Sequence, residues 1–126
     1  MIYGTGIDLV ENDRMEKIIA KWGDKFLTRV FTPGEIAYCG RHRHSAIHYG
    51  ARFAAKESFL KAIGTGMGRG VQMLDIEVVN EQGGKPLLRL HGEALRHIRK
   101  AGVRQIHLSV THTKNYAQAM VVLEKC

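Results

Sequence analysis

Glu57 is a single carboxylate among apolar residues and cations, and this setting needs an explanation. The stretch ARFAAKESFLKAIGTG, at 51–66, predicts a strong helix. At about 100° per residue, Glu57 falls with Gly50 and Lys61 in a slot between two apolar faces. A carboxylate in such a slot is costly unless a cation meets it. That cation is either Lys61, four residues along the helix, or a metal ion shared with a second carboxylate; the helix alone leaves both open.

Asp8 is the candidate for the second carboxylate. Residues 2–10 alternate as a strand does, so Gly4, Gly6 and Asp8 share one face of it. Glycines in a strand leave room for another part of the molecule to approach the backbone closely. The sequence therefore places Asp8 on a glycine-lined face of the strand, where a bulky neighbour could approach the backbone.

The glycine-rich segment GTGMGRG follows the predicted helix and suggests an anion site. It is not the phosphate loop GxxxxGK[ST], which leads into a helix, and it lies at the negative end of the helix dipole. An anion here would depend on Arg52, Lys61, Arg69 and backbone N–H groups. Alternatively, Gly64 simply ends the helix.

The segment HLSVTHT offers a second set of hydrogen-bond donors. A strand would place His107, Ser109 and Thr111 on one face and His112 on the other. Such a row suits phosphate oxygens, although ordinary solvent-facing polarity would look the same.

Three further histidines, with a cysteine nearby, raise the possibility of zinc. The spacing C-x2-H-x-H-x3-H, formed by Cys39, His42, His44 and His48, fits no structural zinc pattern well. A solvated basic loop is the preferred interpretation.

The charge of the chain suggests an anionic partner. The formal net charge is +7, and residues 36–74 hold six Lys and Arg against one acidic residue, as do residues 85–107. An anionic ligand, an acidic protein or a nucleic acid would each provide the counter-charge. A basic surface that serves only solubility is the alternative.

Composition narrows the class of protein further. A chain of 126 residues with 44% hydrophobic residues suits one compact domain over 1–126. No run of eighteen apolar residues predicts a membrane span, and MIYGTGIDLV does not resemble a signal peptide. The two cysteines, Cys39 and Cys126, favour reduced thiols and hence a cytoplasmic location.

The elements that must position these residues can be predicted from periodicity and capping. Asp13 is expected to cap one helix, Thr32-Pro33 with Glu35 to begin another, and Gly102 to end a third. The predicted elements are a strand over 2–10, helices over 14–22, from 33 and over 45–63, strands over 74–79 and 86–90, a helix over 92–101, and strands over 105–111 and 116–124. This order lacks βαβ alternation, which predicts an α+β fold with a mostly antiparallel sheet packed against the long helix.

The two apolar faces of the long helix require packing on both sides. One side is the core of the chain itself. The second face, formed by Tyr49, Phe53 and Leu60, is expected to meet a further layer or a second subunit.

Together, four segments resemble the holo-acyl-carrier-protein synthases, the small bacterial 4'-phosphopantetheinyl transferases. They are GIDLVENDR, FTPGEIAYC, ARFAAKESFLKAIGTG and HLSVTHTKNYAQAMVVLE, and they cover nearly the whole chain in order. The resemblance implies the fold of that family. It also implies transfer of the phosphopantetheine arm of coenzyme A to a serine of apo acyl carrier protein, with Mg²⁺ and with release of adenosine 3',5'-bisphosphate.

The resemblance also assigns roles to residues. It implies that Asp8 and Glu57 are the metal ligands and that Arg14, with its helix, forms the docking surface for the acidic carrier protein. It implies a homotrimer with active sites between subunits, which would explain the second apolar face, and a role in fatty acid biosynthesis. The implied coenzyme A contacts are Arg52, Lys61, Gly64, Thr65, Gly66, His107, Ser109 and Thr111.

Within this interpretation the serine proton needs an acceptor. Glu57, through a metal-bound water, is the candidate base, with Glu35 or Asp8 as alternatives. The sequence departs from the family at Ser58, where alanine is common. Some relatives carry aspartate in place of His112, so the resemblance assigns His112 no role and leaves a catalytic one open.

Two other classes of function remain as alternatives. A nucleic-acid-binding module would use the positive charge, but its strands should interleave aromatic residues with cations, and these strands do not. An oligomeric scaffold protein with no catalytic activity would not explain the presence of Asp8 and Glu57.

Overall fold

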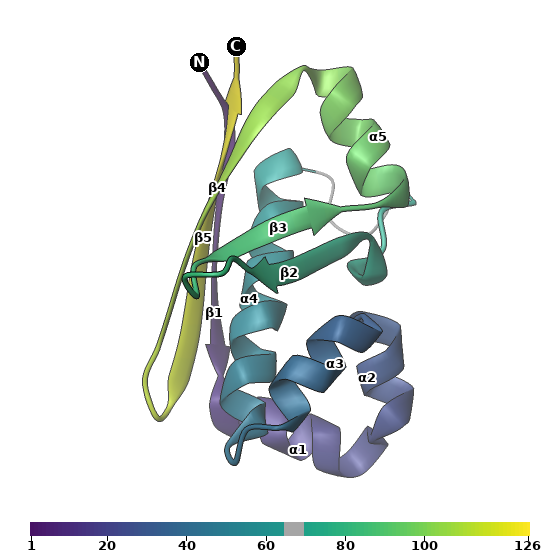
Figure 1. Cartoon of the computed structure of the whole chain (residues 1–126), viewed down its shortest axis with the longest axis vertical. Coiled ribbons are helices and arrows are strands. Elements are labelled where there is room, and N and C mark those ends of the chain that lie inside the picture. Colours follow the sequence, from purple (N-terminus) through teal and green to yellow (C-terminus); the bar gives the residue numbers. More distant parts are fainter. Residues whose placement is uncertain (65–69) are drawn as a thin grey trace.

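A computed structural model describes residues 1–64 and 70–126 of the chain. Figure 1 shows the long helix α4 (Ser45–Ile63) between a three-stranded sheet and a second layer of shorter elements. The sheet contains β1 (Ile2–Glu11), β5 (Tyr116–Lys125) and β4 (Val103–His112), in that order. The second layer contains α1 (Asn12–Trp22), α2 (Asp24–Val30), α3 (Pro33–Gly40), the 3₁₀ turn η1 (Met73–Asp75), β2 (Ile76–Asn80), β3 (Pro86–Leu90) and α5 (Gly92–Ala101).

Each strand pair in the described part of the chain is antiparallel, which confirms the predicted fold class. β5 pairs with β1 on one side and β4 on the other, while β2 and β3 form a separate two-stranded hairpin. In the register of the three-stranded sheet, Ile7 lies opposite Met120, and Met120 lies opposite Ser109. These three residues therefore share the face of the sheet that points away from α4.

The glycines of β1 serve the close approach that the sequence predicts. A Cβ atom on Gly4 would overlap the carbonyl oxygen of Ala62, and one on Gly6 would overlap that of Ser58. The backbone of α4 therefore lies directly against β1. Because Asp8 follows on the same face of the strand, its carboxylate points toward the helix.

Capping signals set several helix boundaries as predicted. Thr32 and Glu35 form a complete capping box at the start of α3, with Pro33 at the first helical position. Gly64 ends α4 at a φ of 78°, and Gly102 ends α5 at the same φ. These left-handed conformations are favourable for glycine because it carries no Cβ.

Three predicted details of the helical region are wrong. α1 begins at Asn12 after Glu11, so Asp13 lies in the first turn rather than at the N-cap. The seven-residue helix α2 is absent from the prediction, because it is too short for its period to be seen and is separated from α1 only by Gly23. The strand predicted from residue 74 starts at Ile76, because η1 precedes it.

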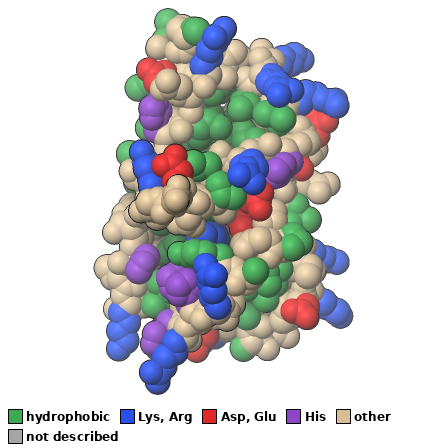
Figure 2. All heavy atoms as spheres, in the orientation of Figure 1, with side chains coloured by type: hydrophobic (Ala, Val, Ile, Leu, Met, Phe, Trp, Pro, Cys, Tyr) green, Lys and Arg blue, Asp and Glu red, His purple; other side chains and the backbone are tan. Residues whose placement is uncertain are grey.

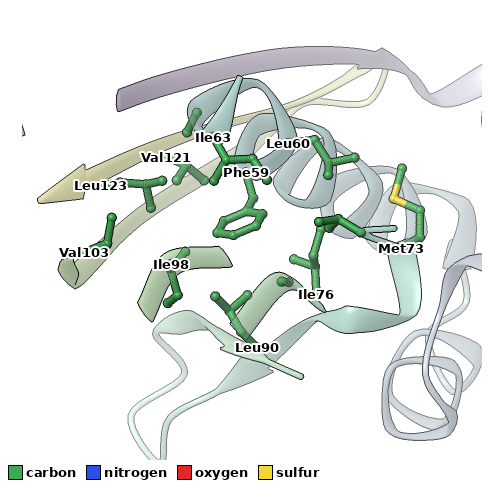
Figure 3. Packing of buried hydrophobic residues seen from close by; sticks show 13 residues of the cluster. Phe59, Leu60, Ile63, Met73, Ile76, Leu90, Ile98, Val103, Val121 and Leu123 are labelled. Carbon is green, nitrogen blue, oxygen red and sulfur yellow. The ribbon is translucent and has the colours of Figure 1, made fainter. Parts of the chain in front are cut away.

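The second apolar face of α4 is covered by the chain itself. Tyr49 packs with Met15, Leu27 and Phe31 of the helical layer. Phe59 and Leu60 of α4 pack into a second cluster, which draws residues from both sheets, η1 and α5. Figure 3 shows them with Ile63, Met73, Ile76, Leu90, Ile98, Val103, Val121 and Leu123. Of the two possibilities that the sequence left open, a further layer of the same chain covers this face, and a second subunit is not needed there.

The apolar surface left open lies elsewhere, on the outer face of the three-stranded sheet. The large hydrophobic side chains exposed there include Ile7, Leu9, Tyr116 and Met120. Figure 2 shows the face of the molecule seen in Figure 1, with Lys and Arg side chains gathered over α5 and histidines gathered at the lower left. Among the helices described, none has the length and apolar character that crossing a membrane requires.

Candidate functional site

Asp8 and Glu57 line one cavity at the junction of β1, α1 and α4. The cavity has a volume of about 290 Å³. Glu11 and Arg14 also line it, and Phe53 contributes an apolar side chain. The other lining residues are Leu9, Val10, Met15, Ile18 and Phe26. The structure thus brings together the two predicted metal ligands and the predicted docking residue.

Lys61 bonds to Asp8 rather than to Glu57. Its Nζ lies 3.0 Å from Asp8 Oδ1 and also donates to the carbonyl oxygen of Ile7 at 2.9 Å. The i to i+4 pair that the helix alone suggests is therefore not the contact formed. Within residues 1–64 and 70–126, Glu57 has no ion pair.

The pKa of Glu57 is raised by this environment. Burial is the main cause, and the negative charge of Asp8 adds to it, while the cation of Lys61 acts in the opposite direction. The two carboxylates are thus close enough to repel each other. A bound cation would relieve both effects.

The donor set of this cavity fits Mg²⁺. Carboxylate oxygens are ligands that Mg²⁺ prefers, and this ion usually takes one or two carboxylates and completes its shell with waters and substrate phosphates. No group of three His, Cys, Asp or Glu side chains in the described part of the chain could hold a metal ion. A pair of carboxylates, Asp8 and Glu57, suits the coordination that Mg²⁺ prefers better than it suits a closed structural zinc site.

Arg52 lies on another side of α4, away from this cavity. It is 7% exposed, its guanidinium lies 4.0 Å from the ring centre of Tyr38, and its Nη2 donates to Asn80 Oδ1 at 2.7 Å. Its buried Nε has no hydrogen-bond partner among the described residues. A hollow of about 490 Å³ beside it is also lined by Arg41 and Arg89, so this is a separate basic pocket.

The sequence did not reveal that pocket in full. Arg52 was predicted to contact a ligand, but Tyr38, Asn80, Arg41 and Arg89 were not. Two of these, Asn80 and Arg89, come from the β2–β3 hairpin, more than twenty residues further along the chain. The cluster of cations at 36–74 was the available signal for Arg41, whereas no pattern in the sequence pairs Tyr38 with Asn80.

His107, Ser109 and Thr111 are also separated from the cavity. They are exposed on the outer face of β4, whereas Asp8 points from the inner face of the sheet toward α4. His107 Nε2 lies 2.9 Å from Glu124 Oε1 on the same outer face. One copy of the chain therefore does not bring this row to Asp8 and Glu57.

The remaining predicted contacts lie at the end of α4. Gly64 is the C-cap of the helix, one turn beyond Lys61. Thr65 and Gly66 lie outside the described residues, as does Arg69.

Three histidines form an aromatic cluster beside Arg52. The rings of His42 and His48 stack with centroids 3.8 Å apart, and His112 meets His48 at 5.9 Å. Burial lowers the pKa of His48, and the neighbouring His42, His112 and Arg52 lower it further. Burial also raises the pKa of Cys39 to about 12, which makes its thiolate a poor candidate for a zinc ligand.

Comparison with known proteins places this geometry in a family. The family model of the 4'-phosphopantetheinyl transferase superfamily matches residues 4–121. The chain belongs to this superfamily. The predicted resemblance and the predicted fold are thereby confirmed.

Individual phosphopantetheinyl transferases resemble the chain over its whole length. The holo-[acyl-carrier-protein] synthase of Syntrophus aciditrophicus is 52% identical over 124 residues, which are 98% of this chain and 97% of that protein. The crystal structure of the synthase from Neisseria meningitidis has a TM-score of 0.90 at 34% identity, covering 99% of this chain and 100% of that one. The synthase from Bacillus anthracis, solved in complex with CoA (3',5'-ADP), has a TM-score of 0.82 at 40% identity, covering 100% and 99%.

Proposed function

We propose that residues 1–126 form one transferase domain that moves the 4'-phosphopantetheine group of coenzyme A to a serine of apo acyl carrier protein, in support of fatty acid biosynthesis. Relatives that share about half of its residues are named for this activity, and a structural neighbour was solved with CoA. The observation that carries the proposal is the meeting of Asp8 and Glu57 in one cavity next to Arg14.

Asp8 and Glu57 would hold Mg²⁺ in this cavity. When bound there, the ion would neutralise charge on the phosphoryl group that is transferred. The raised pKa of Glu57 and its lack of an ion pair in the described part of the chain both support this assignment, because a divalent cation would offset its burial.

The reaction joins the serine oxygen to the β-phosphorus of coenzyme A and breaks the bond from that phosphorus to the oxygen of the departing adenosine 3',5'-bisphosphate. The serine proton must pass to a base as the new bond forms. Glu57 is the candidate acceptor, because it lines the cavity and a bound cation would keep its carboxylate ionised and able to take a proton. Lys61, with half of its side chain exposed beside Asp8, can neutralise the phosphate oxygens.

Glu35, which the sequence left as an alternative base, is excluded by its contacts. It is 1% exposed, and its Oε1 accepts hydrogen bonds from Lys56 and from the backbone N–H of Thr32. Its Oε2 accepts a bond from the backbone N–H of Val78. A carboxylate so enclosed cannot reach a substrate proton, so its role is structural.

The carrier protein would dock along α1, with Arg14 at the entrance to the cavity. Arg14, Lys17 and Lys21 are exposed and fall within about 60° of one another around the helix. Trp22, 52% exposed, continues this surface, and Lys21 Nζ lies 5.2 Å from the centre of its ring. Cations beside an exposed aromatic residue suit an acidic protein partner.

A homotrimer with active sites between subunits would complete the site. The row formed by His107, Ser109 and Thr111 lies on the outer face of the sheet, beside the exposed apolar residues Ile7 and Met120. Burying this apolar face against another copy would bring the row of one subunit toward the cavity of the next. The pocket at Arg52 would supply further cations for the phosphates of coenzyme A.

We place the enzyme in the cytoplasm, where apo carrier proteins and reduced thiols are found. Cys39 and Cys126 are both free cysteines. This agrees with a reducing compartment.

The proposal is tested by incubating the protein with coenzyme A, Mg²⁺ and an apo acyl carrier protein. Mass spectrometry should detect carrier protein heavier by one phosphopantetheinyl group. The reaction should stop when a chelator removes Mg²⁺ and resume when the ion is restored. A carrier protein of unchanged mass under all conditions would refute the proposed activity.

A further inference from the structure

Ser58 links the helix that carries Glu57 to the strand that pairs with Asp8. Its Oγ donates a hydrogen bond of 3.0 Å to the carbonyl oxygen of Ala119, and both residues are buried. Ala119 on β5 is the cross-strand partner of Asp8 on β1. This hydrogen bond therefore connects Ser58, which follows Glu57 in the chain, with the residue that pairs with Asp8 across the sheet.

The spacing of the two carboxylates depends on how α4 lies on the sheet, because the residues come from different elements. Gly4 and Gly6 allow the helix backbone to rest on β1, which sets the height of the helix above the strand. Because these glycines carry no side chains, this contact does little to prevent the helix from sliding along the strand. A hydrogen bond is directional, so the bond from Ser58 to Ala119 opposes sliding as well.

Lys61 makes hydrogen bonds from this part of α4 to β1, and these bonds differ in character from the bond that Ser58 makes to β5. Its bonds reach Ile7 and Asp8 from a side chain that is 53% exposed. Its contact with Asp8 uses the carboxylate that a bound cation would also use. The bond of Ser58 uses a backbone oxygen in the core, so it can persist whether or not a cation is bound.

We infer that Ser58 is a positioning residue that holds Asp8 and Glu57 at the spacing needed to bind a divalent cation. This inference rests on the metal site of the proposed function.

The inference is tested by measuring Mn²⁺ binding to the metal-free protein of 126 residues by electron paramagnetic resonance. The variants are Ser58→Ala, which removes the hydroxyl, and Ser58→Cys, which keeps a similar volume with a weaker donor. Tyr49→Phe is the matched control, since it removes a hydrogen bond of the same helix, from Tyr49 Oη to the carbonyl oxygen of Ile36, outside the cavity. Asp8→Asn reports whether the metal site itself exists.

We expect Ser58→Ala to weaken Mn²⁺ binding by about tenfold. Ser58→Cys should give a smaller loss, and Tyr49→Phe should bind as the unmodified protein does. If Asp8→Asn abolishes binding but Ser58→Ala does not weaken it, the positioning role is wrong and the proposed function stands. An equal loss in Ser58→Ala and Tyr49→Phe would also overturn the positioning role. Unchanged binding by Asp8→Asn would overturn both the metal site and the inference.

Discussion

Lys61 Nζ lies 3.0 Å from Asp8 Oδ1, although Glu57 is the carboxylate one turn away on the same helix. The cation thus joins α4 to β1 instead of neutralising its helical neighbour. Glu57 remains partly buried beside a second carboxylate, with its pKa raised. Asp8 and Glu57 therefore line one cavity, and within the described residues only Asp8 is paired with a cation.

Replacing Lys61 should raise the pKa of Glu57 further. Lys61 lowers this pKa, while burial and Asp8 raise it, so Lys61→Gln removes the opposing influence. Carboxyl ¹³C chemical shifts, followed against pH in metal-free protein, would report the change directly. A Glu57 titration that is the same in both proteins would contradict the geometry described for Lys61.

Removing the buried cation Lys56 should strongly destabilise the fold. Its Nζ lies 2.7 Å from Glu35 Oε1, and neither side chain is exposed to solvent. Lys56→Met leaves the Glu35 carboxylate buried without its counter-charge, which should cost about 3–5 kcal/mol of unfolding free energy, measured by urea denaturation. The double variant Lys56→Met/Glu35→Gln should be more stable than the single variant. A single variant as stable as the unmodified protein would show that the pair contributes little.

Stability should fall in acid in a way that depends on Glu77. Burial raises the pKa of Glu77, but hydrogen bonds from His91 and Thr32 outweigh it, and the net pKa is below 4.5. Because the folded state binds this proton less readily than the unfolded chain, the contribution is complete above pH 4.5 and is lost as the pH falls through the folded pKa.

The measurement for Glu77 compares unfolding free energies of the unmodified protein and of Glu77→Gln between about pH 6 and about pH 3. The variant should be less stable near neutrality, and the difference should narrow in acid. A difference that stays constant over this range would rule out the linkage to Glu77.

Reversing the charge of Arg14 should affect the two substrates unequally. Arg14 lies on α1 at the cavity, on the surface proposed for the carrier protein. Arg14→Glu should raise the KM for the carrier protein by about tenfold or more and leave the KM for coenzyme A nearly unchanged. Arg29→Glu, on the exposed side of α2, is a charge-matched control. Equal losses for both substrates would refute a docking role for Arg14.

Much of this arrangement could be predicted from local patterns. The period of two in β1 placed Asp8 on the glycine face, and the capping box at Thr32 and Glu35 set the start of α3. These features depend on residues close together in the sequence. The slot around Glu57 could be predicted in the same way, from the period of the helix.

Other features depend on which elements dock together, and the sequence does not determine that. The second apolar face of α4 is covered by α1–α3 and the β2–β3 hairpin, so the open apolar surface is on the sheet instead. The contact of Lys61 with Asp8 spans 53 residues, and that of Arg52 with Asn80 spans 28. Helix α2 is so short that packing, rather than periodicity, decides its formation.

The central claim is that Asp8 and Glu57 act together on one divalent cation, and its most direct test is the rate of carrier-protein modification by Asp8→Asn and Glu57→Gln. Both variants keep the size of the side chain while removing its charge. At saturating Mg²⁺, each should lower kcat/KM by about 100-fold or more, with the urea unfolding midpoint nearly unchanged. Activity within about twofold of the unmodified protein in either variant would contradict the account.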